Sequence, residues 1–327
     1  LKKKFKCSHF FDLTFDVSVK DLFLSWSNGC EIYLLQREDI MVPIDFIIRN
    51  KLDVWASVPS VAIILDKMNF LKNNIMPSLK ISMFTGEPLP KTIADKWLLS
   101  SPNSSIWNLY GPTEATVEVS GFKYNKKNNV EYKNGNLPIG TPFNGTDFMI
   151  IDENLTPLKK GMIGEIIYTG LQITKGYLGD TQKTKKSFRI FDWDDKNSIW
   201  YLSGDLGFIN DKNQIECMGR KDNQVKILGK RVEIEEIEFF FKKYTKFKDI
   251  VIIPIKVSFQ HTSFLAAFTT MGFDEEYIHE IRALSKNYIN DIFFPKKIFT
   301  INNFDYMVSG KVDKKNLVEL YNSLVKK

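Results

Sequence analysis

The sequence has few cysteines and histidines, and it lacks several common signatures of catalysis. Its three cysteines, Cys7, Cys30 and Cys217, lie far apart and form no CxxC pair. This argues against a disulfide framework or a zinc ribbon and is typical of a reducing compartment. The three histidines stand in no Ser/His or Cys/His arrangement, which disfavours a catalytic triad. The motifs GxxxxGK[ST], GxGxxG, HExxH and GxSxG are absent.

The sequence also lacks long apolar runs and a strong excess of one charge. No apolar run approaches about 18 residues, so we expect no membrane-spanning helix. The net charge is +6 and the basic residues are scattered. The run Lys2-Lys3-Lys4 predicts a solvated face rather than a nucleic-acid-binding stripe. We therefore expect no binding to nucleic acid. With no recognisable secretory signal, we expect a cytoplasmic protein.

The apolar and aromatic content is sufficient for a large core. The 327 residues are 43% hydrophobic and 26% charged, and they include 26 Phe, 12 Tyr and 6 Trp. At roughly 150 residues per domain, this length predicts about two domains. The chain opens at Leu1 and soon enters the apolar run 10–15, which we interpret as a core strand. We therefore expect it to begin inside a larger domain.

The pattern along the chain changes twice. Up to about residue 120, strands are predicted at 54–58, 80–85 and 106–110, buried helix faces at 23–26 and 44–48, and a helix at 90–99. This arrangement predicts a parallel, covered sheet. From about 120 to 218, short strands between Gly, Pro and Asn turns predict a small β-rich subdomain. We therefore predict an α/β domain over 1–218 that contains this subdomain, and an α+β domain over 219–327.

One segment combines a sharp turn with polar side chains. Residues 108–114 read Asn-Leu-Tyr-Gly-Pro-Thr-Glu and follow a predicted strand. Loops at the carboxyl ends of strands are where open α/β sheets bind ligands. There Tyr110 offers a flat face for a base, Thr113 can donate to a phosphate, and Glu114 can hold Mg²⁺. The alternative is an ordinary Gly-Pro turn.

Three further segments combine glycine with charge. Residues 201–206 place Asp205 after a Gly turn, where a carboxylate can accept hydrogen bonds from ribose hydroxyls. Residues 219–233 are dense in charge and β-branched side chains, and residues 309–313 place Lys311 on a Gly-flexed loop. Taken singly, these segments also fit a common Gly-Asp turn, a solvated hairpin and a solvated lysine.

In this order, the four segments resemble the adenylate-forming (AMP-binding) superfamily, which includes peptide-synthetase adenylation domains, acyl-CoA synthetases and luciferases. Residues 15–18 and 164–178 resemble two more of its motifs, so the resemblance covers essentially the whole chain. The sequence is similar to the amino-acid adenylation branch, and most of all to D-alanine–D-alanyl carrier protein ligases. The segments that support this are 54–60, 84–87, 111–117, 176–179 and 235–239.

The resemblance implies a two-step ligase reaction that uses ATP and Mg²⁺. A carboxylate attacks the α-phosphate of ATP to give an acyl-adenylate and pyrophosphate, and the acyl group then moves to the phosphopantetheine thiol of a carrier protein. Positioning and charge neutralisation dominate such chemistry. The residues that the resemblance places around the nucleotide are Gly86, Glu87, Asn108, Leu109, Tyr110, Gly111, Pro112, Thr113, Asp205 and Arg220.

The resemblance also implies individual roles for residues outside that set. Glu114 would bind Mg²⁺, and Lys311 would be catalytic, bridging the substrate carboxylate and the α-phosphate. Asp222 would be the hinge about which a mobile C-terminal domain swings between the two half-reactions. Lys226 and Gly229 would serve the thiolation step.

The residues implied at the substrate favour an amino acid over a fatty acid. Asp16 would pair with the α-ammonium group, because a buried carboxylate needs a cationic partner; alternatively, it caps a helix that begins near residue 19. Lys20, Thr85, Val117 and Glu118 would surround the side chain. Thr85 stands where D-alanyl ligases have Cys, and Lys20 and Glu118 are charged where apolar or small residues are usual. We expect the two charges to pair, or one to contact a polar substrate, which argues against D-alanine.

One family feature has no counterpart here. The Ser/Thr/Gly-rich loop that holds the β- and γ-phosphates through backbone N–H groups is not recognisable in the 15 residues before Asp16. We therefore expect an N-terminally truncated ligase, and whether it turns over ATP alone stays open. An acyl-CoA synthetase, which Asp16 disfavours, and an inactive remnant or binding module are the alternatives.

Overall fold

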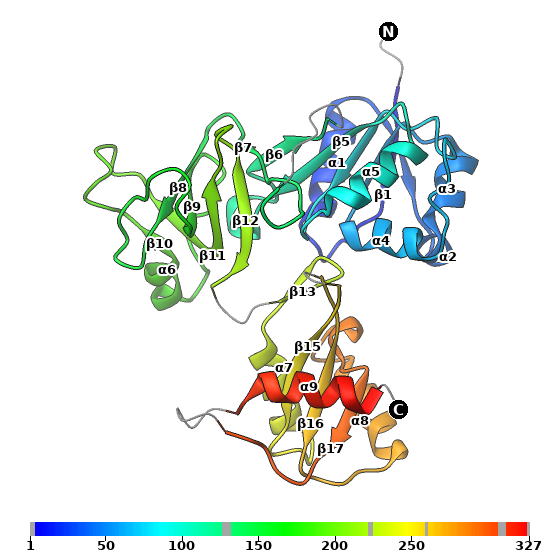
Figure 1. Cartoon of the computed structure of the whole chain (residues 1–327), viewed down its shortest axis with the longest axis vertical. Helices are drawn as coiled ribbons and strands as arrows, with labels where there is room; N and C mark the ends of the chain where they lie inside the picture. The colour runs from blue at the N-terminus through cyan, green and yellow to red at the C-terminus, as the bar shows by residue number, and fades with distance from the viewer. Residues whose placement is uncertain (1–3, 126–131, 222–224, 259–260, 307–311, 326–327) are drawn as a thin grey trace. The chain divides into compact units, whose positions relative to one another are not determined.

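The computed structural model describes residues 4–125, 132–221, 225–258, 261–306 and 312–325. The chain divides into two compact units, unit 1 (Leu1–Asp222) and unit 2 (Asn223–Lys327), as Figure 1 shows. The sequence predicted a domain boundary at residue 219, a few residues before this division.

Unit 1 contains a seven-stranded sheet in the order β2-β1-β3-β4-β5-β6-β7. Strands β1 to β5 pair in parallel, whereas β6 and β7 are antiparallel, so the sheet is mixed. The predicted strands at 54–58, 80–85 and 106–110 are confirmed as β3, β4 and β5. The seven strands are β1 (Lys6–His9), β2 (Glu31–Leu34), β3 (Val54–Ser57), β4 (Ile81–Phe84), β5 (Ser105–Tyr110), β6 (Ser120–Lys123) and β7 (Thr141–Pro142).

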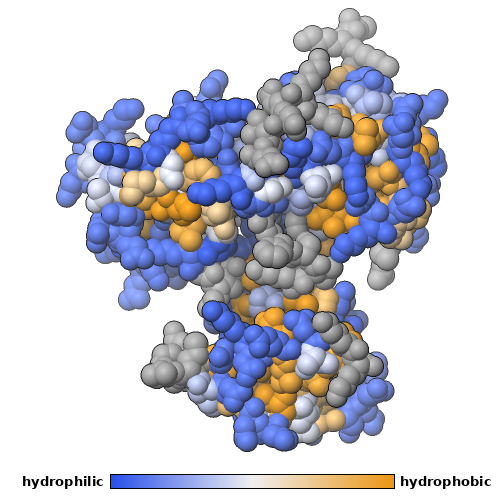
Figure 2. Space-filling model, in the orientation of Figure 1, coloured by the Kyte–Doolittle hydropathy of each residue, from blue (hydrophilic) through white to orange (hydrophobic). Residues whose placement is uncertain are grey.

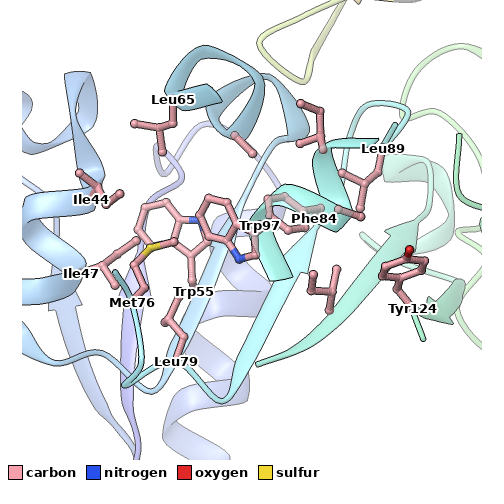
Figure 3. Close-up of a cluster of buried hydrophobic side chains, with 14 of the residues drawn as sticks. Ile44, Ile47, Trp55, Leu65, Met76, Leu79, Phe84, Leu89, Trp97 and Tyr124 are labelled. Carbon is pink, nitrogen blue, oxygen red and sulfur yellow. The ribbon is translucent and has the colours of Figure 1, made fainter. Parts of the chain in front are cut away.

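Helices cover both faces of this sheet. They are α1 (Val17–Ser27), α2 (Arg37–Met41), α3 (Pro43–Asn50), α4 (Pro59–Lys67) and α5 (Lys91–Ser100). Successive strand residues point to opposite faces. Trp55 and Phe84 therefore join a large apolar cluster with α3, α4 and α5, whereas Ala56 and Met83 join a smaller one with α1. In Figure 3, Trp55 lies beside Trp97 in the large cluster, with ring centroids 6.5 Å apart.

Two expectations for the first 30 residues are wrong. Residues 10–15 form no strand, because β1 ends at His9 and turns lead from there into α1. Phe11 is buried but Leu13 is 74% exposed, so the apolar run marked neither a strand nor a continuous segment of the core. Residues 23–26 lie in helix α1, but Phe23 is 63% and Trp26 58% exposed, so this helix face is not buried.

The predicted β-rich part of unit 1 is a five-stranded antiparallel sheet. Its elements are β8 (Thr146–Ile151), β9 (Gly164–Gly170), α6 (Thr181–Ser187), β10 (Phe188–Arg189), β11 (Trp200–Ile209) and β12 (Ile215–Arg220). It begins later than the predicted residue 120, because β6 and β7 extend the first sheet instead. The predicted turn around Gly204 is an irregularity within β11, whose register with β9 shifts between Leu202 and Leu206.

Unit 2 is a sheet with helices on both faces. The strand order is β14-β13-β16-β15, and β17 pairs with β16. Ile252 and Leu265 contribute to one apolar cluster with α7 and α8, whereas Ile253 and Phe268 contribute to another with α9. The elements are β13 (Val225–Ile227), β14 (Lys230–Val232), α7 (Ile234–Tyr244), β15 (Val251–Ser258), β16 (His261–Thr269), α8 (Glu275–Ser285), β17 (Lys297–Thr300) and α9 (Lys314–Val325).

Apolar residues also reach the surface of both units. On the face in view, Figure 2 shows them as patches bordered by hydrophilic residues. Among the helices formed by the described residues, none has the length and apolar character needed to cross a membrane.

Candidate functional site

Several of the predicted site residues follow the carboxyl ends of parallel strands in unit 1. Asp16 follows β1 and opens α1, Thr85, Gly86 and Glu87 follow β4, and residues 111–118 follow β5. The carboxyl ends of parallel strands meet at one edge of a sheet, and this edge is where open α/β sheets bind ligands. The fold thus places these three segments on one edge.

Residues 111–118 form a tight loop, which we call the β5–β6 loop. Its ends are joined because the Val119 N–H donates to the Tyr110 carbonyl oxygen at 2.8 Å. Gly111 is required inside it, because a Cβ there would lie 2.4 Å from the Val117 oxygen and 2.6 Å from the Glu118 Cα. Thr116 and Val117 adopt φ angles of 57° and 73°. Two adjacent β-branched residues in the left-handed region mark a strained backbone.

Gln172 braces this strained stretch from the β-rich part of unit 1. The side-chain NH2 group of Gln172 donates to the backbone carbonyl oxygen of Glu118 at 2.9 Å. The backbone carbonyl oxygen of Gln172 accepts from the Thr116 hydroxyl at 2.6 Å. Thr146 donates to the Gln172 side-chain oxygen at 3.1 Å. These bonds hold the unusual conformation of the β5–β6 loop in place.

Asp16 faces the β5–β6 loop rather than its own helix. The Thr113 hydroxyl donates to Asp16 Oδ2 at 2.6 Å. Asp16 occupies the N-cap position of α1, yet its side chain makes no capping hydrogen bond there. The position predicted by the capping alternative is therefore present, but its hydrogen bond is not.

Lys20 and Glu118 form a nearly buried ion pair. Nζ of Lys20 lies 3.0 Å from Oε1 of Glu118 and 3.7 Å from Oδ1 of Asp21. The Lys20, Glu118 and Asp21 side chains are 14%, 8% and 2% exposed. Burial opposes the charge on Lys20, but the two carboxylates outweigh it and raise the pKa of Lys20. Burial raises the pKa of Asp21 to about 7, against the attraction of Lys20.

Asp205 joins the first sheet to the β-rich part. The Tyr110 hydroxyl donates to Asp205 Oδ2, and Arg220 donates to Oδ1 at 3.0 Å. Asp205 and Arg220 face each other across β11 and β12. Burial, together with the charge of Asp205, raises the pKa of Tyr110 well above its usual value, which keeps this hydroxyl a donor. Since a carboxylate offers about four acceptor positions, these two donors do not saturate Asp205.

Glu114 lies in the short 3-10 helix η1 (Thr113–Ala115) of the β5–β6 loop. The Tyr177 hydroxyl donates to its Oε1 at 2.6 Å. Among the described residues, no three His, Cys, Asp or Glu side chains gather as a metal site. Mg²⁺, however, is commonly held by one or two carboxylates together with substrate phosphates. The single carboxylate of Glu114 fits that kind of site.

Two predicted nucleotide-binding residues make structural contacts. Glu87 Oε2 accepts from the Ser60 N–H at 2.9 Å and so satisfies a free N–H at the start of α4. Asn108 is buried, and its amide donates to the carbonyl oxygens of Leu137 and Pro138. These contacts position the segments after β4 and β5.

The remaining predicted residues divide between the units. In unit 1, Leu109 and Thr85 are buried, and the Thr85 N–H donates to the Ser57 oxygen at 3.2 Å. Pro112, half-buried, precedes η1. In unit 2, Lys226 lies on β13 and Gly229 in the two-residue turn between β13 and β14. Lys311 and Asp222 lie outside the described residues.

Three residues of this region were not predicted from the sequence: Asp21, Gln172 and Tyr177. Asp21 had a local signal, because it adjoins Lys20 on a helix. Tyr177 lies within the segment 164–178 that resembles a family motif, but nothing in the sequence placed it against Glu114. Gln172 carries no signal, because its role depends on the contact between the two sheets of unit 1.

The chain resembles known proteins over most of its length. Residues 2–178 match the family described as AMP-binding enzyme. A D-alanine–D-alanyl carrier protein ligase from Bacillus velezensis is 32% identical over 315 residues, which are 94% of this chain and 61% of that protein. A ligase of the same name from Bacillus cereus is 30% identical over 312 residues, 93% of this chain and 60% of that protein.

A solved structure shows the same fold. The crystal structure of the Vibrio cholerae adenylation domain AlmE in complex with glycyl-adenosine-5'-phosphate matches with a TM-score of 0.87 at 30% identity, covering 99% of this chain and 60% of that one. The fold is thus that of an adenylation domain, an α/β fold with mixed sheets and a β-rich subdomain. The chain spans about 60% of the length of these relatives. Because the family match covers more than half of its residues, the chain belongs to the AMP-binding enzyme family.

Proposed function

We propose that the chain is part of a ligase that activates an amino acid with ATP and passes it to a carrier-protein thiol. The amino acid carboxylate displaces pyrophosphate from ATP to give an aminoacyl-adenylate. The thiol sulfur then attacks the acyl carbon, loses its proton and releases AMP, leaving a thioester. The observation that carries the proposal is the arrangement of two carboxylates around the segment 110–113. Asp205 accepts a hydrogen bond from Tyr110 at one end of this segment, and Asp16 accepts one from Thr113 at the other end.

Each carboxylate suits one end of an aminoacyl-adenylate. Asp205, with Arg220 beside it, would accept hydrogen bonds from the ribose hydroxyls. Asp16 would pair with the α-ammonium group, while its bond with Thr113 fixes its orientation. Gly86, Gly111 and the other loop residues would let the backbone approach the adenine and phosphates. These roles follow the family resemblance, and the contacts of Asp16 and Asp205 support them.

Magnesium would be held by Glu114 together with the phosphates of ATP. Bound there, it would neutralise phosphate charge during adenylation. The Tyr177 hydroxyl would keep the Glu114 carboxylate oriented. Burial and the neighbouring Glu114 raise the pKa of Tyr177, so this residue remains a hydrogen-bond donor at neutral pH.

Unit 2 would be the mobile C-terminal domain. Asp222 would be its hinge, Lys311 would bridge the substrate carboxylate and the α-phosphate, and Lys226 and Gly229 would approach the phosphopantetheine arm. Relatives named D-alanyl carrier protein ligases support a carrier protein as the partner. The β13–β14 turn, where Leu228 and Gly229 have φ angles of 49° and 78°, would be the part of this hairpin that meets the arm.

The proposal is tested with a stable aminoacyl-adenylate analogue, glycyl-sulfamoyl-adenosine, which needs no grip on the β- and γ-phosphates. We expect saturable calorimetric binding to the 327-residue chain. Asp16→Asn and Asp205→Asn should each weaken it by about 10- to 100-fold, since a hydrogen bond to a charged group contributes roughly 1.5–3 kcal/mol.

Asp147→Asn is the matched control, because Asp147 is an exposed carboxylate on β8. This variant should bind like the parent chain. Absence of saturable binding, or binding that neither site variant weakens, would contradict the proposed function.

A further inference from the structure

The Lys20–Glu118 ion pair stands close to Asp16 along helix α1. Asp16 and Lys20 are four positions apart, so they lie on the same side of the helix, about 6 Å apart along its axis. Both reach the β5–β6 loop, where Asp16 accepts from Thr113 and Lys20 pairs with Glu118. A substrate ammonium held by Asp16 would therefore lie within one helical turn of this ion pair.

The ion pair is fixed from several sides. The backbone of Glu118 is held on both sides. Its N–H donates to the backbone oxygen of Thr116 at 3.0 Å, and its backbone carbonyl oxygen accepts from the side-chain amide of Gln172 at 2.9 Å. Asp21 attracts Lys20 from within the same helix, at 3.7 Å. Moving Lys20 aside would leave Glu118 as a nearly buried carboxylate without its cation, which is strongly unfavourable.

An apolar cluster begins next to Asp16 in the chain. Val17, which follows Asp16, is buried in a cluster with Phe11, and Met83 and Val117 pack against that cluster. The region thus combines an apolar wall with one fixed ion pair. Neither part offers an unpaired charge for a substrate side chain.

We propose that the Lys20–Glu118 pair restricts the substrate to amino acids whose side chain is a hydrogen or a methyl group. This inference rests on the proposed function, because it places the substrate's ammonium group at Asp16. A longer apolar side chain would have to lie against the ion pair and strip its remaining water. A charged side chain would meet a like charge on one partner and compete with the existing bond to the other.

The geometry of Lys20 and Glu118 decides between the two alternatives left by the sequence. The charges pair with each other, as the 3.0 Å distance shows, so no polar substrate side chain is needed to satisfy them. Either alternative was expected to argue against D-alanine, but a pair whose charges satisfy each other does not by itself oppose a methyl side chain. Glycine and alanine then become the expected substrates, and a polar substrate becomes an outcome of the test.

The test compares sulfamoyl-adenosine analogues that carry glycyl, D-alanyl, L-leucyl, L-glutamyl and L-lysyl groups. Calorimetric titration of the parent chain should give tight binding of the glycyl and D-alanyl analogues. The other three should bind about 100-fold more weakly, a ratio in the range that pocket shape alone can produce.

The variant Lys20→Met/Glu118→Leu replaces the ion pair with apolar side chains of similar size, an exchange that buried ion pairs often tolerate. It should gain at least about tenfold for the leucyl analogue relative to the glycyl one. The same double exchange at Lys96 and Asp66, an ion pair whose lysine is 51% exposed, should leave the profile unchanged. Thermal unfolding of both variants checks that they fold.

The outcomes separate the two proposals. Equal binding of the glycyl and leucyl analogues to the parent chain would overturn the inference and leave the proposed function standing. Preference for the glutamyl or lysyl analogue would overturn it in favour of a polar substrate. An unchanged profile in the folded double variant would also overturn it, and failure of every analogue to bind would overturn both proposals.

Discussion

At the scale of single residues, the site region has more buried acidic than basic groups. Lys20 lies within 4 Å of both Glu118 and Asp21. His9 Nδ1 lies 3.9 Å from Asp21, but burial lowers the pKa of His9 and disfavours its cationic form. One lysine therefore serves two carboxylates, and Asp21 is the one whose ionisation the fold opposes.

This balance predicts a pH dependence of stability that Asp21 causes. Its pKa rises from 3.8 to about 7 on folding, so the folded state binds the proton more tightly than the unfolded state. The stabilisation is complete below about pH 4 and disappears as the pH rises to 7, a change of a few kcal/mol at about 1.4 kcal/mol per pKa unit. Urea unfolding of the parent chain and of Asp21→Asn at pH 4 to 7 measures it.

The difference between the two proteins is the informative quantity, because the lowered pKa of His9 gives the parent chain a contribution of opposite sign. The parent chain should lose stability relative to Asp21→Asn as the pH rises. If the two unfolding free energies run parallel from pH 4 to 7, Asp21 is not held in its protonated form by the fold.

Residue types and motif order singled out individual residues of the candidate site and one possible pair, but not the other contacts among these residues. Asp16, Asp205 and Arg220 were predicted from their segments, and Lys20 and Glu118 were expected to interact. That Tyr110 and Arg220 both bond to Asp205 depends on how two sheets meet. No local pattern encodes such a contact.

At the scale of elements, the β5–β6 loop depends on a residue without a side chain. Gly111→Ala would place a Cβ 2.4 Å from the Val117 oxygen, and backbone atoms cannot move aside as a flexible side chain can. We expect a loss of about 1–3 kcal/mol in unfolding free energy and weaker binding of glycyl-sulfamoyl-adenosine. Gly272→Ala, whose Cβ would meet nothing within 4 Å, should change neither. Equal effects of the two substitutions would contradict this role of Gly111.

Elements with strong local patterns were predicted well, and those that depend on their surroundings were not. The buried strands β3, β4 and β5 and the helix α5 lie where the sequence pattern indicated. Residues 10–15 are as apolar as a strand, but they form turns in which Phe11 is buried and Leu13 is 74% exposed. The exposed Phe23 and Trp26 are a second case, because an apolar helix face predicts burial without indicating what covers it.

At the scale of the whole molecule, the two units have separate cores. Among the described residues, each buried apolar cluster belongs to a single unit. We therefore expect residues 223–327, produced alone, to fold and to unfold cooperatively in urea. A featureless, non-cooperative transition for this polypeptide would mean that unit 2 needs unit 1 in order to fold.

The most direct test of the account is a crystal structure of the chain with glycyl-sulfamoyl-adenosine bound. We expect the ribose hydroxyls at Asp205, the ammonium group within hydrogen-bond distance of Asp16, and an intact Lys20–Glu118 pair beside the glycyl carbon. An analogue bound away from the β5–β6 loop, or with its ammonium group on Glu118 instead of Asp16, would contradict it.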